Sequence, residues 1–304
     1  MFPEEVKTVF KNLRNEARVF FWLRAGGPIL IRGADEPGLD PLLPDMRFVR
    51  AWRNGQEAPY IPGSSLKGVL RSRAEQIVRA LAPKEMIIQD LFDEQREMEK
   101  EMRNRSGREV YYASDPLTQL FGQTYLAGRL SCSDAFPIEG EPVRLNVRTH
   151  VAINRITGAT QGKALFTPEV VEEGVFGGDV TLTNFALWQL KLVGLLLQDL
   201  DEGYVLLGGS TTRGYGRVKV ENVRVTVRDY RCAPPGPTIR GYEDDDVADV
   251  GECRFDRKEY CWECSARGIE WFGNLKIDIV AELERLLRKQ TEARCKREKV
   301  SHGG

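Results

Sequence analysis

The chain has 304 residues, enough for one elaborated domain or two small ones. A hydrophobic content of 41% excludes global disorder. It holds no run of about 18 apolar residues, and its polar start lacks the apolar core of a secretory signal, so we expect no membrane span and a cytoplasmic location. In that reducing compartment we expect the six cysteines to be free thiols or metal ligands rather than disulfides.

The formal net charge of −1 is unusual for a nucleic-acid binder, which is often basic overall. The charges are segregated, however. Acids gather at 243–246, whereas bases mark the glycine-rich turns, at Lys67, Arg71, Arg73, Arg213 and Arg217. Attraction to phosphate is local, because salt screens it within about 8 Å. Local clusters of bases therefore matter more than the sum.

The first half of the chain predicts a strand at 19–31, a polar loop at 33–44 and a helix at 66–81. Ser64 or Ser65 is expected to cap that helix. A charged helical insertion is expected over about 84–108. A short capped helix that ends at a glycine follows at 114–122.

The second half alternates strands with one apolar helix. Strands are expected at 128–136, 143–153, 178–183, 204–207 and 217–227, a polar excursion at 154–174, and a helix at 185–200 capped by Thr183 or Asn184. This order predicts an α+β fold of the ferredoxin-like or RNA-recognition-motif kind, an antiparallel sheet with two helices on one face. Residues 231–304 read as an extension, a Cys-containing linker followed by a charged helix at 269–297.

Two glycine-rich segments are typical of phosphate cradles. In Pro59-Tyr-Ile-Pro-Gly-Ser-Ser-Leu-Lys-Gly68, the residues Gly63, Ser64 and Ser65 stand at a helix start, where free amides attract phosphate, and Lys67 and Arg71 share one helix face. The alternative is an ordinary helix cap. In the second segment, 208–216, small residues allow close backbone approach, and Arg213 and Arg217 flank it. Its alternative is a tight hairpin.

Together these segments resemble the RAMP superfamily of CRISPR-associated proteins. The match is close at 61–71, a second stands at 208–218, and 154–174 looks like the thumb hairpin of the backbone (Cas-seven-like) subunits of type III effector complexes. The resemblance implies a palm domain at 1–230 with an inserted thumb at about 154–176. It also implies that the chain stacks with other effector subunits along a guide RNA, and that the thumb displaces bases of the guide–target duplex.

The resemblance further implies a target-RNA nuclease whose aspartate lies upstream of the first cradle and acts with Mg²⁺ or another divalent cation. Asp45 matches best, with Asp40 and Asp35 as alternatives in the same loop. A carboxylate can act as a general base toward the 2′-OH of RNA or hold hydrated Mg²⁺. The alternatives are a surface acid, in a purely structural RNA-binding subunit, and a guide-processing endoribonuclease. The last typically relies on an N-terminal histidine, and here the two histidines are His150 and His302.

The remaining candidate residues are those expected to contact RNA or to bind a metal ion. We expect contacts to RNA from Arg47, Arg50, Arg155, Thr157, Lys163, Phe166 and Tyr215. Phe166 and Leu165 could wedge between bases, and Tyr215 could stack on one; packing within the protein is the alternative for all three. Cys-x2-Cys spacing makes Cys261 and Cys264, with Cys232 and Cys253, a candidate set for structural Zn²⁺, against free thiols.

Overall fold

The computed structural model describes residues 12–33, 44–86, 88, 105–250 and 253–301, with the backbone alone at 161–165 and 292–301. Its helices are α1 (Gly63–Leu81), α3 (Gly107–Ala113), α4 (Pro116–Phe121), α5 (Leu187–Glu202) and α6 (Ile279–Ser301), with 3₁₀ turns η2 (Thr211–Arg213) and η3 (Ile269–Asn274). Most of the expected insertion at 84–108 lies outside the described residues. Within the described ranges, none of these helices combines the length and apolarity that a bilayer span requires.

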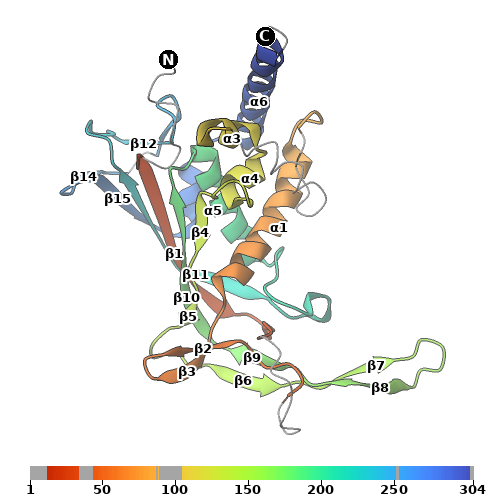
Figure 1. Ribbon diagram of the computed structural model, residues 1–304. Helices are drawn as coiled ribbons and strands as arrows, with labels where there is room; N and C mark the ends of the chain where they lie inside the picture. Colours follow the sequence, from red (N-terminus) through yellow and green to blue (C-terminus); the bar gives the residue numbers. More distant parts are fainter. Residues whose placement is uncertain (1–11, 34–43, 87, 89–104, 251–252, 302–304) are drawn as a thin grey trace.

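The core of the molecule is an antiparallel sheet in which strands follow the order β14-β15-β11-β1-β10-β4, with β5 pairing on β10 (Figure 1). Its strands are β1 (Asn15–Ala25), β4 (Leu130–Cys132), β5 (Phe136–Pro137), β10 (Val175–Thr183), β11 (Val218–Asp229), β14 (Asp256–Arg257) and β15 (Trp262–Arg267). The central strands stand in ferredoxin-like order, fourth, first, third and second along the chain. The α+β prediction is confirmed.

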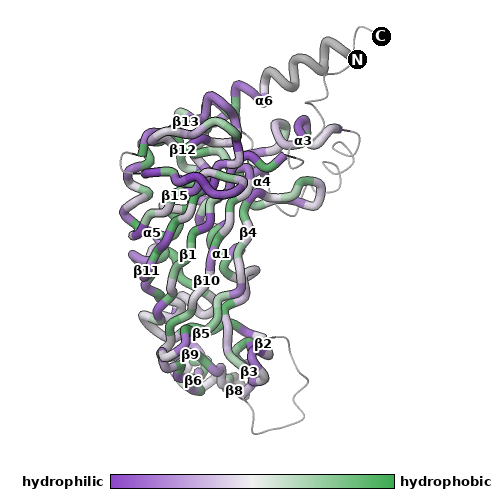
Figure 2. Tube along the Cα trace, turned by 90° about the vertical axis from the view of Figure 1, so that its left-hand side faces the viewer, coloured by the Kyte–Doolittle hydropathy of each residue, from purple (hydrophilic) through white to green (hydrophobic). Residues whose placement is uncertain are grey.

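Strand β1 shows why this sheet forms. Its residues alternate between buried and partly exposed, with Ala17, Val19, Phe21 and Leu23 fully buried on the face that the helices cover. Figure 2 shows the apolar residues running along β1, β10 and α5. The strand ends at Ala25, earlier than the predicted 31, because Gly26 and Gly27 let the chain turn before residues 29–32.

Helix α1 packs a narrow apolar stripe against the sheet. Leu66, Leu70, Ala74 and Val78 are buried at four-residue intervals. The helix begins at Gly63, and neither Ser64 nor Ser65 caps it. The side chain of Asp134 accepts a hydrogen bond from the Gly63 amide at 2.8 Å instead. A Cβ at Gly63 would clash with the backbone of Cys132 and Ser133, so this close approach requires glycine.

Helix α5 is apolar around most of its circumference because it is covered on two sides. The sheet lies on one side, and residues after 268 lie on another, where the Phe272 ring touches Gly194 and the Phe272 carbonyl accepts a hydrogen bond from Lys191 at 2.8 Å. The helix begins at Leu187, later than predicted. The strand expected at 204–207 does not form; these residues are irregular and lead from α5 to the glycine-rich segment.

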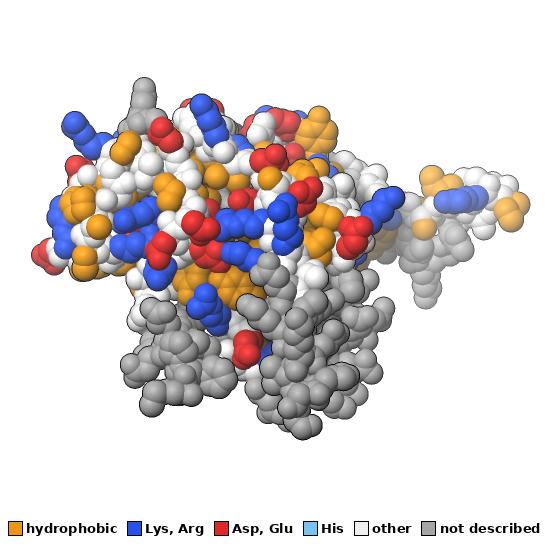
Figure 3. All heavy atoms as spheres, turned by 90° about the horizontal axis from the view of Figure 1, so that it is seen from above, with side chains coloured by type: hydrophobic (Ala, Val, Ile, Leu, Met, Phe, Trp, Pro, Cys, Tyr) orange, Lys and Arg blue, Asp and Glu red, His pale blue; other side chains and the backbone are white. Residues whose placement is uncertain are grey.

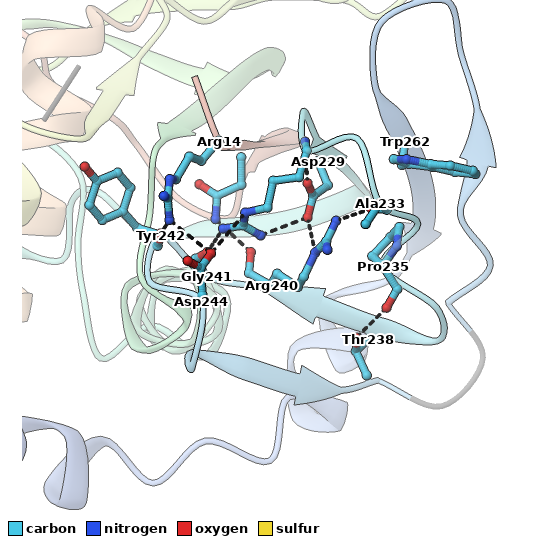
Figure 4. A network of polar contacts seen from close by, with 12 residues as sticks. Arg14, Asp229, Ala233, Pro235, Thr238, Arg240, Gly241, Tyr242, Asp244 and Trp262 are labelled. Carbon is cyan, nitrogen blue, oxygen red and sulfur yellow. Dashed lines mark hydrogen bonds and ion pairs between the residues drawn. The ribbon is translucent and has the colours of Figure 1, made fainter. Parts of the chain in front are cut away.

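The extension after residue 230 is joined to the main sheet. Strand β15 pairs with β11, and Asp229, which is buried, accepts hydrogen bonds from Arg240 at 2.7 Å and from Arg231 at 3.0 Å (Figure 4). A small separate sheet, β12 (Thr238–Arg240) and β13 (Val247–Asp249), lies next to this network. The expected C-terminal helix is divided into η3 and α6, and α6 projects from the body (Figure 1).

The residues predicted as a thumb, at about 154–176, fall largely within a β structure that begins earlier, at Arg144, and projects from the end of the palm opposite α6 (Figure 1). Two antiparallel pairs build it: β6 (Arg144–Val147) with β9 (Glu169–Glu173) at its base, and β7 (His150–Ile153) with β8 (Thr160–Phe166) beyond. A second hairpin, β2 (Arg50–Arg53) with β3 (Gln56–Pro59), lies beside the thumb base.

Candidate nucleic-acid interface

Residues 28–32 connect the two glycine-rich segments. The Leu30 carbonyl accepts a hydrogen bond from Gly209 at 2.8 Å, and the Ile31 carbonyl accepts one from Val49 at 2.9 Å. The Val49 carbonyl in turn accepts one from Tyr60, at 3.3 Å, three residues before α1. The same segment pairs with the thumb base through Ile29 and Val171. The glycine-rich segment, the start of α1 and the thumb base therefore form one connected region.

At the start of α1, the two predicted bases differ in what they can offer a phosphate. Arg71 donates to the Gly122 carbonyl at 3.0 Å and pairs with Glu75 at 3.3 Å, so its charge is used to join α1 to the end of α4. Lys67 is half-buried, and this burial lowers its pKa. Ser64 is exposed and Ser65 half-buried. The side chains available to a ligand here are Ser64, Ser65 and Lys67.

The glycine-rich segment is a turn rather than a strand hairpin. Gly208, Ser210, Gly214 and Gly216 all have positive φ, which is why small residues recur here. Arg217, predicted to face RNA, donates instead to the Glu202 carbonyl at 3.1 Å and lies against Gly203 at the end of α5. That position uses the guanidinium to satisfy a helix C-terminus.

The thumb is joined to this segment by an aromatic cluster of His150, Phe166, Arg213 and Tyr215. The Tyr215 hydroxyl lies 2.7 Å from Nε2 of His150, whose ring stacks on Phe166 with centroids 5.0 Å apart. The Arg213 guanidinium lies over the Phe166 ring, 5.0 Å from its centroid. Tyr215 is 3% exposed, so it packs the thumb root and has no ring face open to a base.

Asp45 is an exposed residue held against the thumb base. Its Oδ2 accepts hydrogen bonds from the amide of Thr167 at 2.8 Å and from the hydroxyl of Thr167 at 2.9 Å. The neighbouring Met46 forms a backbone bridge with Pro168. Asp45 therefore stands where the loop before α1 meets the thumb. Asp35 and Asp40, the alternatives, lie outside the described residues.

The two arginines that follow Asp45 are both paired. Arg50 binds Glu169 at 2.6 Å with only 14% of its side chain exposed, and the other Glu169 oxygen accepts from the Phe48 amide at 2.9 Å. The Arg50 side chain therefore joins the loop to the thumb base and is not available to bind phosphate. Arg47 is more exposed and approaches Glu57 at 3.9 Å.

A family model places these features in context. The model of the RAMP superfamily matches residues 22–219, well over half of the chain. The chain belongs to the RAMP superfamily. Among curated proteins, none matches it. RAMP proteins generally bind CRISPR RNA within multi-subunit complexes, and the match spans both glycine-rich segments, Asp45 and the thumb.

Within this RAMP chain, the thumb tip carries a feature that the sequence reading missed. Ile156 is 95% exposed and Ile153 is 66% exposed, beside the exposed Arg155 and Thr157. The Asn154 side chain accepts from the amides of Ile156 and Thr157, at 2.9 and 3.1 Å, and so shapes the turn. The available signal in the sequence was an isoleucine within the polar stretch 154–174, since apolar side chains can insert between bases. The side chains of Lys163 and Leu165 lie outside the described residues.

The four cysteines proposed for zinc do not come together. Cys253 and Cys264 form a disulfide that ties the segment before β14 to β15, whereas Cys232 is exposed and Cys261 buried without joining them. Across the described ranges, no group of three or more His, Cys, Asp or Glu side chains could hold a metal ion. Cys-x2-Cys spacing suits two ligands, but Cys264 lies within β15 and is bonded to Cys253, whereas Cys261 precedes that strand.

Figure 3 shows how charge is arranged on the face seen from above. Lysine and arginine side chains alternate with aspartate and glutamate there, and the thumb projects beyond this body. The acids of 243–246 take part in this mixing: Asp245 pairs with Arg285 at 2.6 Å and Asp244 with Arg14 at 3.1 Å. The acidic run thus pairs with bases of the same chain, so part of its negative charge is compensated locally.

Proposed function

We propose that this RAMP protein is a backbone subunit of a type III CRISPR effector complex, which binds guide RNA beside other subunits of the complex. The observation that carries this proposal is the thumb root, where Tyr215 and His150 join the projecting hairpin to the glycine-rich segment. A hairpin fixed in this way keeps its orientation when it meets a duplex. Guide backbone would lie along Ser64, Ser65 and Lys67, with Arg213 at the thumb root and Arg155 at its tip.

The thumb supports the second part of the proposal, displacement of bases in the guide–target duplex. Inserting an apolar side chain between bases costs a few kcal/mol of lost base stacking. The contacts that the bases make with the inserted side chain offset this cost. Ile156 and Ile153 offer such a wedge because neither is covered by the protein itself. Phe166, which we expected to act as the wedge, lies at the root between His150 and Arg213.

The third part is cleavage of target RNA by Asp45. A displaced nucleotide can reach the in-line geometry that a duplex forbids, and its own 2′-OH is the nucleophile. Asp45 can take the proton of that hydroxyl, while its bonds to Thr167 hold the carboxylate in place. As the 2′-oxygen bonds to phosphorus, the bond from phosphorus to the 5′-oxygen breaks; the products are a 2′,3′-cyclic phosphate and a 5′-hydroxyl, which takes its proton from water. A lone exposed carboxylate also fits hydrated Mg²⁺, which usually binds through one or two carboxylates, waters and substrate phosphates. When bound to Asp45, Mg²⁺ would neutralise charge on the phosphate.

The experiment compares Asp45→Asn with wild type in the assembled complex, with guide RNA, labelled complementary target RNA and Mg²⁺. Asparagine keeps an oxygen for Thr167 but is neither a base nor a strong Mg²⁺ ligand. We expect cleavage at the position served by this subunit to fall about 100-fold or more, with target binding unchanged. Asp256→Ala, at an exposed aspartate of β14, is the matched control. Undiminished cleavage in Asp45→Asn would remove Asp45 from the reaction.

A second candidate is a structural RNA-binding subunit without nuclease activity. It is favoured by the bonding of Asp45, because Thr167 already occupies one carboxylate oxygen. Binding of target RNA without cleavage by the wild-type complex, in the presence of Mg²⁺, would support this candidate. The guide-processing endoribonuclease has less support, because His150 is committed to Tyr215 and Phe166 in the thumb root. Metal-free cleavage of precursor guide RNA by the isolated chain would revive it.

A further inference from the structure

Trp52 is an indole left in solvent on a rigid support. It is 77% exposed, on the β2–β3 hairpin. The hairpin turns at Asn54 and Gly55, whose φ values of 52° and 81° are those of a two-residue turn that matches the twist of paired strands. A tryptophan exposed to this extent leaves much of its apolar ring in water, which is unfavourable unless a ligand covers it.

One face of the hairpin is anchored to the palm. Ala51, Arg53, Gln56 and Ala58 share this face, because cross-strand partners in an antiparallel pair point the same way. The Arg53 guanidinium lies 4.4 Å from the Phe136 centroid. Tyr60, which continues the chain into α1, stacks on the same ring at 5.3 Å. The hairpin is therefore fixed relative to the sheet.

Trp52 lies on the opposite face, together with Arg50 and Glu57. Both neighbours reach the region of the candidate nuclease: Arg50 binds Glu169 of the thumb base at 2.6 Å, and Glu57 approaches Arg47, two residues after Asp45, at 3.9 Å. Trp52 is the cross-strand partner of Glu57 and follows Arg50 by two residues, so it shares their face and is exposed there. Its ring is thus presented on the side where the Asp45 loop meets the thumb.

The surroundings of Trp52 favour a nucleobase over a protein partner. Over the described residues 44–61, Trp52 is the one large apolar side chain that is exposed. The charged residues on its face of the hairpin are Arg50 and Glu57, and Arg47 lies against Glu57. A protein interface has a contiguous apolar centre, whereas a base needs one flat ring with cations nearby for its phosphates. We propose that Trp52 stacks on an unpaired nucleobase of RNA at the thumb base. This inference rests on the proposed function and names the residue against which the unpaired base would stack.

The test uses the full chain and single-stranded RNA that carries 5-iodouridine. Irradiation should cross-link the RNA to the peptide that contains Trp52. Trp52→Ala should lose this cross-link and bind the RNA about 5- to 150-fold more weakly, the range for loss of one base–aromatic stack. Trp52→Phe should recover most of the affinity. The slope of log affinity against log salt should stay constant, because a neutral side chain releases no counterions.

The control is Tyr260→Ala, at a 63% exposed aromatic residue in the turn between β14 and β15. It should bind RNA like wild type, and all variants should share one unfolding midpoint. RNA binding that is unchanged in Trp52→Ala overturns the stacking and leaves the proposed function intact. Unchanged RNA binding with altered self-association would identify Trp52 as a protein contact and also overturn it. Failure of the wild-type chain to bind RNA removes the proposed function and the stacking together.

Discussion

Oδ2 of Asp246 accepts a hydrogen bond from the amide of Leu187 at 2.9 Å, so a carboxylate from the extension caps a central helix of the palm. The first turn of α5 leaves amides without helical partners, and Asp246 satisfies one of them. This contact crosses the boundary at 230 and explains why α5 begins at Leu187. The extension thus contributes directly to the stability of the RNA-binding domain.

Stability should therefore depend on the charge of Asp246. Burial raises the pKa of this carboxyl from its ordinary 3.8 to about 6. The folded state therefore binds the Asp246 proton more tightly than the unfolded state does. The stability that this proton contributes is fully present below about pH 4 and is lost as the pH rises through about 6. The free energy of unfolding of wild type, measured against Asp246→Asn, should fall across this window by at most about 3 kcal/mol.

Asparagine keeps the oxygen that accepts from Leu187 and does not titrate. The effects of the other acids on stability are present in both proteins and therefore cancel in this comparison. Asp246→Ala removes the cap and should be about 0.5 to 2 kcal/mol less stable than Asp246→Asn. Urea unfolding at a series of pH values measures both effects. A difference between wild type and Asp246→Asn that does not change with pH would contradict the assigned titration.

Tyr215→Phe tests the thumb root. Removal of the hydroxyl leaves His150 Nε2 without its 2.7 Å partner in a partly buried site, which should lower the free energy of unfolding by about 1 kcal/mol. Denaturant unfolding checks this, with Tyr260→Phe as a control that should change by less than about 0.5 kcal/mol. Unchanged stability together with weaker RNA binding would assign the Tyr215 hydroxyl to RNA instead.

Ile156→Ala tests the wedge. The side chain is 95% exposed, so the variant should unfold within about 0.5 kcal/mol of wild type. In a complex that contains guide RNA and target RNA with 2-aminopurine at the displaced position, fluorescence should fall toward that of the stacked duplex. Val247→Ala, at an exposed valine of β13, should leave the signal high. Full fluorescence in Ile156→Ala would show that another residue displaces the base.

Removal of divalent cations should separate binding from cleavage. EDTA should abolish cleavage of target RNA by the assembled complex, because Asp45 alone offers one carboxylate and Mg²⁺ would supply charge neutralisation at the phosphate. Binding of guide and target should persist, since it rests on cationic side chains and stacking. Cleavage at an unchanged rate in EDTA would require a metal-free role for Asp45.

Local signals predicted the parts of this fold that local contacts determine. The short helix at 114–122 is one: Asp115 accepts from the amides of Leu117 and Thr118 at 2.9 and 3.1 Å, and Gly122 follows its end with a positive φ. The cap of α1 was mispredicted because Asp134 takes the place of the nearby serines. That partner lies far along the chain and leaves no local pattern.

The candidate site was predicted in outline for the same reason. Glycine-rich segments and a loop aspartate are visible as motifs, whereas the pairing of an arginine is not. Arg50 and Arg71 read as phosphate ligands, yet Glu169 and the Gly122 carbonyl engage them. Trp52 and Ile156 were missed because exposure depends on which face of a hairpin points away from the protein.

The most direct test of the central claim is the RNA that the chain holds in cells. The tagged full chain is expressed together with a CRISPR array and purified at moderate salt. The RNA bound to it is then extracted and sequenced. The account predicts strong enrichment of CRISPR-array transcripts over total cellular RNA. Recovery of no RNA, or of RNA in the proportions of the whole cell, would contradict it.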